Sequence, residues 1–310
     1  MKKGKTKVWS FAGGKGGSGK SFLAAHFAIA LEKLGYRVLV LDLDFCGSNI
    51  HTFLGLRKYN HTLNDFFISE NQSSFESFLS PTDFPKLMCM PGETRRFFDS
   101  RTATKWDLEL LLKTARESSF DFVLIDLGTG TNPEKLQVLT KSDERFVVTQ
   151  PDPVSIEKTY RFYEAYLQSL MGIQTSDYYA VWRKYESQRK ASFSINLNLK
   201  NMIEKEFPEI HQGLIEKGDR SLRLIINSSR SHSDQSLGPS IQSVSYKFYG
   251  WAFNYTGCVD FDNAVWQSAR AMKPLWIEHP HSPVLGQIMS IAKIFHFKQV
   301  QESQILRSAG

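Results

Sequence analysis

Residues 13–21 carry the spacing of a loop that holds the phosphates of a nucleotide; they read Gly-Gly-Lys-Gly-Gly-Ser-Gly-Lys-Ser. Gly14, Gly19, Lys20 and Ser21 meet the usual phosphate-loop pattern. The glycines let backbone N–H groups approach phosphate oxygens, and the lysine neutralises phosphate charge. The hydroxyl can occupy a coordination position on Mg²⁺. These residues therefore predict a site for a nucleotide and its magnesium ion.

A second lysine, Lys15, lies five positions before Lys20 in the same loop. Lys20 already serves the phosphates, so the earlier lysine needs a different explanation. Its ammonium group can contact the same nucleotide, or it can reach a nucleotide held by a facing copy of the chain. The spacing of the two lysines leaves both alternatives open.

The segments on either side of the loop supply the elements that must position it. Residues 7–11 form a short apolar run typical of a strand, and apolar residues recur at helical spacing from Leu23 to Leu34. A strand, a glycine-rich loop and a helix together direct backbone N–H groups and a helix N-terminus at an anion.

Further apolar runs predict strands, and each ends in polar residues. They lie at 38–41, 122–125, 145–149 and 222–226. The polar residues that follow them are Asp42, Asp44, Asp126, Gln150 and Asn227. Helical patterns at 104–118 and 155–170 separate the runs, which predicts an α/β fold with a doubly wound, mostly parallel sheet flanked by helices. Because ligands bind at the carboxyl ends of such strands, these polar residues are expected to converge on the loop.

The loop also carries a family resemblance. Lys15-Gly16-Gly17-Ser18-Gly19-Lys20-Ser21 resembles the deviant Walker A loop of the MinD/ParA family of P-loop ATPases. The sequence is most similar to the FlhG-like branch, which also has Asp-Leu-Gly after the Walker B strand, here residues 126–128. The resemblance covers about residues 7–160 and 222–297.

The resemblance implies roles for individual residues. It implies that Lys15 crosses a dimer interface, that Asp44 lies near the attacking water, and that Asn227 reads the adenine edge. Gly128 and Gly130 would form a second switch. The implied catalytic residues are Lys15, Lys20 and Asp44, and the implied metal-binding residues are Ser21, Asp44 and Asp126. The implied nucleotide-binding residues are Gly14, Lys15, Gly16, Gly17, Ser18, Gly19, Lys20, Ser21, Phe22 and Asn227. The segment from Asp260 to Pro274 is similar to the family's late loop on the adenine side. The family has proline where this chain has Asp260, so an adenine contact at that position is in doubt.

The function implied is an ATPase that binds ATP/ADP and Mg²⁺, hydrolyses ATP slowly, and forms an ATP-dependent homodimer. Its task would be spatial regulation in a bacterial cell, such as the placement or number of flagella. The alternatives are a DNA-binding partitioning ATPase of the ParA type and a nucleotide-binding adaptor with little turnover. An electron carrier or metal-insertion factor would need paired cysteines, and a tyrosine kinase of this fold would need tyrosines beyond Tyr255, the last one.

The chain is expected to form one ATPase domain at 1–297, interrupted by a mostly helical insertion at 161–221, with a polar tail at 298–310. Aromatic residues mixed with Arg and Lys in the insertion suit either a nucleic-acid or lipid-headgroup patch or a packed helical subdomain. The insertion is the expected site for an unknown protein partner. A stripe of Leu285, Ile288, Ala292 and Phe295 predicts a helix that docks on the core.

Composition limits what can be expected of the core, the surface charge, the cysteines and the location of the protein. A chain of 310 residues with 41% hydrophobic residues can bury a large core, and its net charge of +6 permits weak association with a membrane surface or DNA. Cys46, Cys89 and Cys258 form no C-x-x-C pair, so we expect reduced thiols and no disulfides. The lysine-rich start of the chain leads into the first strand without an apolar signal segment. We therefore expect a cytoplasmic protein, with peripheral association at the inner face of the cell membrane left open as an alternative.

Overall fold

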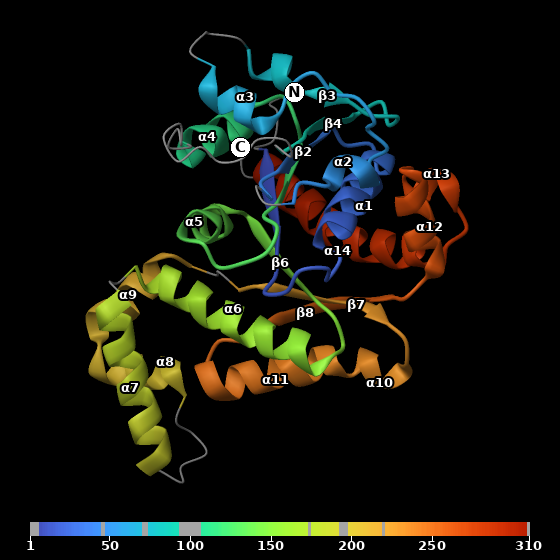
Figure 1. The fold of residues 1–310 in the computed structure, drawn as a ribbon. Helices are drawn as coiled ribbons and strands as arrows, with labels where there is room; N and C mark the ends of the chain where they lie inside the picture. The colour runs from blue at the N-terminus through green and yellow to red at the C-terminus, as the bar shows by residue number, and fades with distance from the viewer. Residues whose placement is uncertain are drawn as a thin grey trace.

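A computed structural model of the chain describes residues 6–44, 47–69, 74–92, 107–172, 175–191, 198–218 and 221–308. Cys46, residues 104–106 of the predicted helical pattern, residues 1–5 and residues 309–310 lie outside these ranges. The tail predicted at 298–310 instead continues helix α14 (Pro283–Ser308) as far as Ser308. Within them, one sheet runs in the spatial order β3-β4-β2-β5-β1-β6-β7-β8 (Figure 1). Its strands are β1 (Lys7–Ala12), β2 (Val38–Asp42), β3 (Ser80–Pro81), β4 (Leu87–Met90), β5 (Phe122–Asp126), β6 (Glu144–Thr149), β7 (Arg223–Ser229) and β8 (Asn254–Asp260). All neighbours are parallel except β3 and β4, which confirms the predicted fold class.

The central strands are buried on both faces, which explains their nearly unbroken apolar sequences. Alternate residues of β5 face opposite sides, so Val123 and Ile125 join one core while Phe122 and Leu124 join the other. The register sets Asp42 at the end of β2 beside Asp126 at the end of β5. Two carboxylates therefore share one edge of the sheet.

Helices cover both faces of the sheet. One face is covered by α1 and α14, and the other by α4, α5, α6 and α11. Their bounds are α1 (Lys20–Lys33), α4 (Leu108–Glu117), α5 (Pro133–Lys141), α6 (Pro153–Met171), α11 (Leu237–Tyr249) and α14 (Pro283–Ser308). Short helices lie in the connections: α2 (Ile50–Phe53), α3 (Leu63–Ile68), the 3-10 helix η1 (Phe75–Phe78), α10 (His232–Gln235), α12 (Asn263–Ala271) and α13 (Leu275–Glu278).

The predicted insertion contains three helices that follow α6. They are α7 (Thr175–Ala191), α8 (Leu199–Glu206) and α9 (Pro208–Glu216), and Figure 1 shows them gathered beside α6, away from α1. Tyr178 and Tyr185 are buried, and the Tyr185 hydroxyl donates a 2.6 Å hydrogen bond to Phe248 O on α11. Much of the aromatic content of the insertion therefore packs inward, as a helical subdomain requires.

The C-terminal helix α14 begins at Pro283 and continues to Ser308. The predicted stripe docks on the core, since Leu285, Ile288, Ala292 and Phe295 are all buried. Over the described part of the chain, every helix is too short or too polar to cross a bilayer.

Candidate nucleotide site

The phosphate loop runs from the end of β1 to the start of α1, as the sequence predicts. Gly17 and Gly19 have φ of 77° and 92°, in the left-handed region that favours glycine. A side chain at Gly14 would lie 2.2 Å from Lys158 O on α6, so only glycine lets the loop approach that helix. The loop therefore presents its backbone next to the first turns of α6.

Lys20 lies inside the loop. Its ammonium group donates to Lys15 O at 3.0 Å and to Ser18 Oγ at 3.4 Å, and its side chain is buried. Burial lowers the pKa of Lys20, while the charges of Asp126 and Asp44 oppose this shift. The lysine is thus held at the centre of the loop, near the carboxylates of Asp44 and Asp126.

Asp126 has the features of a carboxylate that holds a metal ion. It accepts a 3.1 Å hydrogen bond from Gly128 N, and the nearby Ser21 hydroxyl acts to lower its pKa. Its Oδ2 atom is buried and has no hydrogen-bond partner in the described structure. Burial raises the pKa of Asp126 despite these two groups and the nearby Lys20 charge. A hydroxyl and a carboxylate with a free buried oxygen are oxygen ligands that suit Mg²⁺.

Asp42 has a different role from Asp126, which lies beside it at the end of β5. Its carboxylate accepts from Ser48 Oγ at 2.7 Å and from the backbone N–H groups of Asp44, Asn49 and Ile50. Burial, with the nearby charge of Asp126, raises the pKa of Asp42 to about 7. Asp42 therefore organises the loop that carries Asp44.

Asp44 lies against the second predicted switch. A side chain at Gly128 would come within 2.3 Å of the Asp44 carboxyl group, and Gly128 has φ of 62°. The next glycine, Gly130, also has a positive φ, at 99°. Gly128 of the predicted second switch is thus in direct contact with Asp44, and a side chain at position 128 would displace the Asp44 carboxyl group. The role of Asp44 in positioning the attacking water stays a prediction.

Asn227 lies within β7, which runs on to Ser229, whereas the sequence predicts a strand that ends before it. The register of β7 against β8 shifts after Asn227, where Ser228 has a positive φ of 61°. The Asn227 amide nitrogen donates a 2.8 Å hydrogen bond to Ser18 O. It therefore braces the phosphate loop from β7. Contact with an adenine edge stays a prediction.

Lys15 points away from the interior of the loop. Its Nζ atom forms an ion pair with Asp152 Oδ2 at 3.2 Å, and the two side chains are 30% and 40% exposed. Asp152 is also the N-cap of α6, since it accepts from Ser155 N at 3.0 Å. The Ser155 bonds, and then Lys15, lower the pKa of Asp152. The Asp-Pro that opens α6 is a recognisable helix start, but nothing in it indicates a contact with Lys15.

Sequence reasoning also missed Lys135 on α5. Its ammonium group donates to Thr129 O at 2.7 Å, within the second switch. Its charge also contributes to lowering the pKa of Lys20. A single lysine on a helix gives no signal of such a contact, because it depends on how α5 packs.

The family model of ParA, described as NUBPL iron-transfer P-loop NTPase, matches residues 5–176. This match includes the phosphate loop, strands β2 and β5 with Asp42 and Asp126 at their ends, and Asp152. The chain belongs to the ParA family of P-loop NTPases. Nucleotide hydrolysis is the general activity of this class.

Two curated relatives point to different cellular roles. The flagellum site-determining protein YlxH of Helicobacter pylori is 28% identical over 159 residues, which cover 51% of this chain and 53% of that protein. An iron-sulfur cluster carrier protein of Pyrococcus horikoshii is 33% identical over 173 residues, which cover 51% of this chain and 57% of that protein. The chain thus matches about half the length of these relatives. One of these relatives is named for flagellar site determination and the other for iron-sulfur cluster carriage.

A solved structure extends the comparison to the whole fold. The septum site-determining protein MinD of Pyrococcus horikoshii, complexed with Mg-ADP, aligns with a TM-score of 0.61 and 19% identity. The alignment covers 94% of this chain and 96% of that one. The MinD-like fold therefore includes β7, β8 and α14, which lie beyond the region matched by the family model.

Cysteine positions bear on the iron-sulfur relatives. Cys89 is buried on β4 and Cys258 is partly buried on β8, and both are free thiols. These strands are the second and the last in the sheet order, so the two thiols are far from each other. Cys46 lies outside the described residues.

Proposed function

We propose that this protein is a Mg²⁺-dependent ATPase whose ATP-bound form is a face-to-face dimer. The observation that carries the proposal is the contrast between the two lysines of the loop. Lys20 is buried within it, whereas Lys15 is held at the surface by one partly exposed ion pair. Because such pairs contribute only about 0–1 kcal/mol, Lys15 can exchange Asp152 for a phosphate group of a facing protomer.

The proposed chemistry assigns a task to each residue. Residues 14–22 would hold the phosphates, and Ser21 and Asp126 would hold Mg²⁺, which supplies electrostatic stabilisation of the γ-phosphate when bound. Lys20 neutralises phosphate charge from within its own protomer, and Lys15 adds charge from the partner. Asp44 orients the attacking water. Hydrolysis removes the γ-phosphate contact, and the two protomers separate.

The test is the oligomeric state, measured by size-exclusion chromatography with light scattering. We expect a monomer with ADP and a dimer when Asp44→Ala, which slows hydrolysis, is saturated with ATP. Adding Lys15→Ala should abolish the dimer while ADP binding persists. Lys141→Ala is the matched control, because it removes a surface ion pair with Glu109 far from the loop. A strictly monomeric Asp44→Ala protein with ATP would refute the proposed switch.

The proposed cellular task is spatial regulation, such as flagellar placement or the positioning of another large assembly. The flagellum site-determining relative supports it. The dimer would act as a cytoplasmic switch that associates with the inner face of the membrane, with ParA-type DNA binding as the competing mode. Co-sedimentation with anionic liposomes and with duplex DNA, in ADP and in ATP, separates these modes. Binding to DNA that weakens steeply with salt would favour partitioning.

Iron-sulfur carriage is the second candidate, because one curated relative carries that name. Anaerobic incubation with ferrous iron and sulfide, followed by absorption spectroscopy, tests it. The separation of Cys89 from Cys258 predicts that these two cannot share a cluster. A stable chromophore that survives replacement of both, and is lost with Cys46→Ser, would support the carrier role.

A further inference from the structure

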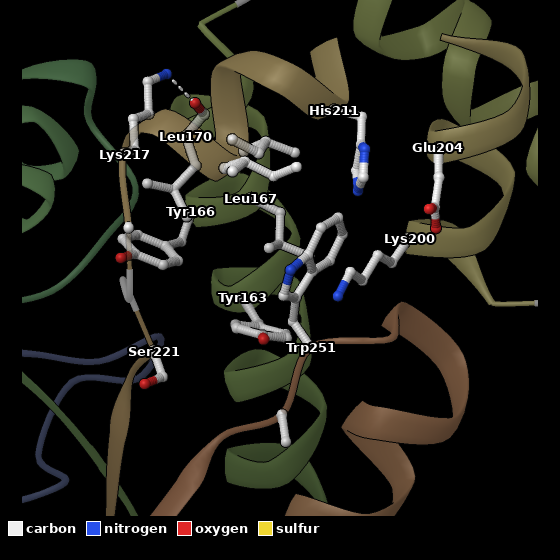
Figure 2. Close-up of a pocket in the computed structure, with 14 residues that line it drawn as sticks. Tyr163, Tyr166, Leu167, Leu170, Lys200, Glu204, His211, Lys217, Ser221 and Trp251 are labelled. Carbon is white, nitrogen blue, oxygen red and sulfur yellow. Dashed lines mark hydrogen bonds between the residues drawn. The ribbon is translucent and has the colours of Figure 1, made fainter. Parts of the chain in front are cut away.

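A cavity of about 430 Å³ lies where the insertion meets α6, well away from the phosphate loop. Tyr163, Tyr166, Leu167 and Leu170 of α6 form one wall, and Leu214 of α9 and Trp251 after α11 face them (Figure 2). The volume falls within the range of about 300–1,000 Å³ typical of small-molecule sites, and the walls are mainly apolar and aromatic. The cavity is thus suited to the body of a small organic molecule.

Two nitrogen-bearing side chains approach the cavity without ion-pair partners among the described residues. Figure 2 shows Lys200 of α8 and His211 of α9 extending toward the ring of Trp251. Both side chains are partly buried. The acidic residue of the lining, Glu204, is exposed, so water screens its charge more effectively. The local charge therefore favours an anion.

Tyr163 adds a hydrogen-bonding group on the inner wall. Its side chain is only 1% exposed, and burial raises its pKa well above the usual range, which keeps the hydroxyl protonated. No described residue forms a hydrogen bond with this hydroxyl, and it is not among the fully buried unpaired atoms. Buried hydroxyls are normally hydrogen-bonded, so this one is available to a ligand in the cavity it lines.

Lys217, by contrast, is already engaged. Its ammonium group donates to Leu170 O, which fixes the end of α9 against the last turn of α6 (Figure 2). This bond leaves Lys200 and His211 as the basic side chains of the lining that can meet a ligand.

We propose that this cavity binds a small organic anion with an apolar or aromatic body. The body packs on Tyr166, Leu167 and Trp251, and the anionic head accepts hydrogen bonds from Lys200 and His211. The Tyr163 hydroxyl contributes a further hydrogen bond. The site does not depend on the proposed dimer, since all of its residues come from one protomer.

Two probes of different shape test the site: 1-anilinonaphthalene-8-sulfonate, followed by fluorescence, and decanoate, followed by calorimetry and by displacement of the first probe. We expect a single site for each. Lys200→Met should weaken decanoate binding about tenfold, because it removes a charged hydrogen-bond donor. It should leave the binding of neutral decanol unchanged. Tyr163→Phe, which keeps the ring, should weaken decanoate about threefold.

The controls separate site loss from misfolding. Lys205→Met lies on the same helix, outside the cavity lining, and should bind decanoate like the unchanged protein. All variants should retain the same affinity for Mg-ADP, which reports an intact nucleotide domain. If neither probe binds, or if Lys200→Met binds decanoate as well as the unchanged protein does, the proposal is wrong. Equal binding of decanol and decanoate would also overturn it.

Discussion

Lys15 and Asp152 are separated by 137 positions in the sequence, yet the Lys15 Nζ atom lies 3.2 Å from Asp152 Oδ2. Asp152 also caps the first turn of α6. The residue that distinguishes this phosphate loop is therefore attached to the start of a long helix, and its release changes the surroundings of that helix.

Asp152→Asn should release Lys15 while preserving the helix cap, because asparagine is also a favourable N-cap residue. Loss of a partly exposed ion pair in each protomer favours the ATP dimer by up to about fivefold per lysine, with little change in stability. Sedimentation equilibrium in ATP on the Asp44→Ala background measures this effect. The matched control is Asp107→Asn, another aspartate N-cap, on α4. A weaker dimer in Asp152→Asn than in the control would contradict the exchange of partners.

Gly128→Ala should slow ATP hydrolysis and destabilise the protein. The added methyl group would lie 2.3 Å from Asp44 Cγ, and alanine at φ of 62° costs about 1–2 kcal/mol by itself. Gly35→Ala separates the two effects, since Gly35 has φ of 99° and no atom within 4 Å of an added Cβ. We expect a stability loss alone in Gly35→Ala, and a loss of both stability and phosphate release in Gly128→Ala. Unimpaired hydrolysis in the latter would exclude a role for the Asp44 contact.

Asp126→Asn should remove the dependence of ADP affinity on Mg²⁺, since its buried Oδ2 atom has no hydrogen-bond partner among the described residues and is the proposed Mg²⁺ ligand. Calorimetry of ADP binding with Mg²⁺ and with EDTA measures this dependence. Asp42→Asn is the control, because the neighbouring carboxylate already accepts four hydrogen bonds from its own loop. It should change stability and leave the effect of Mg²⁺ intact. If Asp42→Asn removed the effect of Mg²⁺ on ADP affinity and Asp126→Asn did not, the metal would be assigned to Asp42.

The burial of His26 in its neutral form predicts a loss of stability in mild acid. It is fully buried, with Nδ1 donating to Phe22 O and Nε2 accepting from Leu275 N, and burial lowers its pKa to about 4. The unfolded chain, with a pKa near 6.5, binds a proton first, so stability is complete above pH 6.5 and declines as pH falls toward 4. The decline reaches about 2 kcal/mol at pH 5.

Urea unfolding at pH 7.5 and pH 5 measures the His26 effect. His26→Gln, which cannot titrate, should lose less stability between these values than the unchanged protein. His232→Gln replaces an exposed histidine and should behave like the unchanged protein. An identical pH dependence in His26→Gln would show that other groups cause the decline.

The parts of the fold that the sequence predicted correctly are those buried on both faces. Strands β1, β2, β5, β6 and β7 read as apolar runs because helices cover both of their sides. The edge strand β8 was not predicted, since Asn254–Asp260 is mostly half-exposed and contains Gly257 in its interior. The short β4 was also missed, because Leu87–Met90 lacks β-branched residues.

For the site, the sequence identified the loop and its carboxylates because their spacing is local. Contacts between distant segments could not be predicted. The Asn227 brace on Ser18 joins residues 209 positions apart, and the approach of Gly14 to Lys158 depends on how α6 packs. Such contacts are fixed by tertiary packing, which no local pattern encodes.

Helix α6 has a consequence for regulation. It has 19 residues, which at about 1.5 Å each span about 28 Å. Its first turns contact Lys15 and Gly14, and its last turns line the cavity. A ligand that binds in the proposed cavity and shifts this helix would alter nucleotide affinity, and reciprocity would then require the nucleotide to alter ligand affinity by the same factor. In that case the two sites would be coupled through one helix, and binding at either site could be measured as a change in affinity at the other.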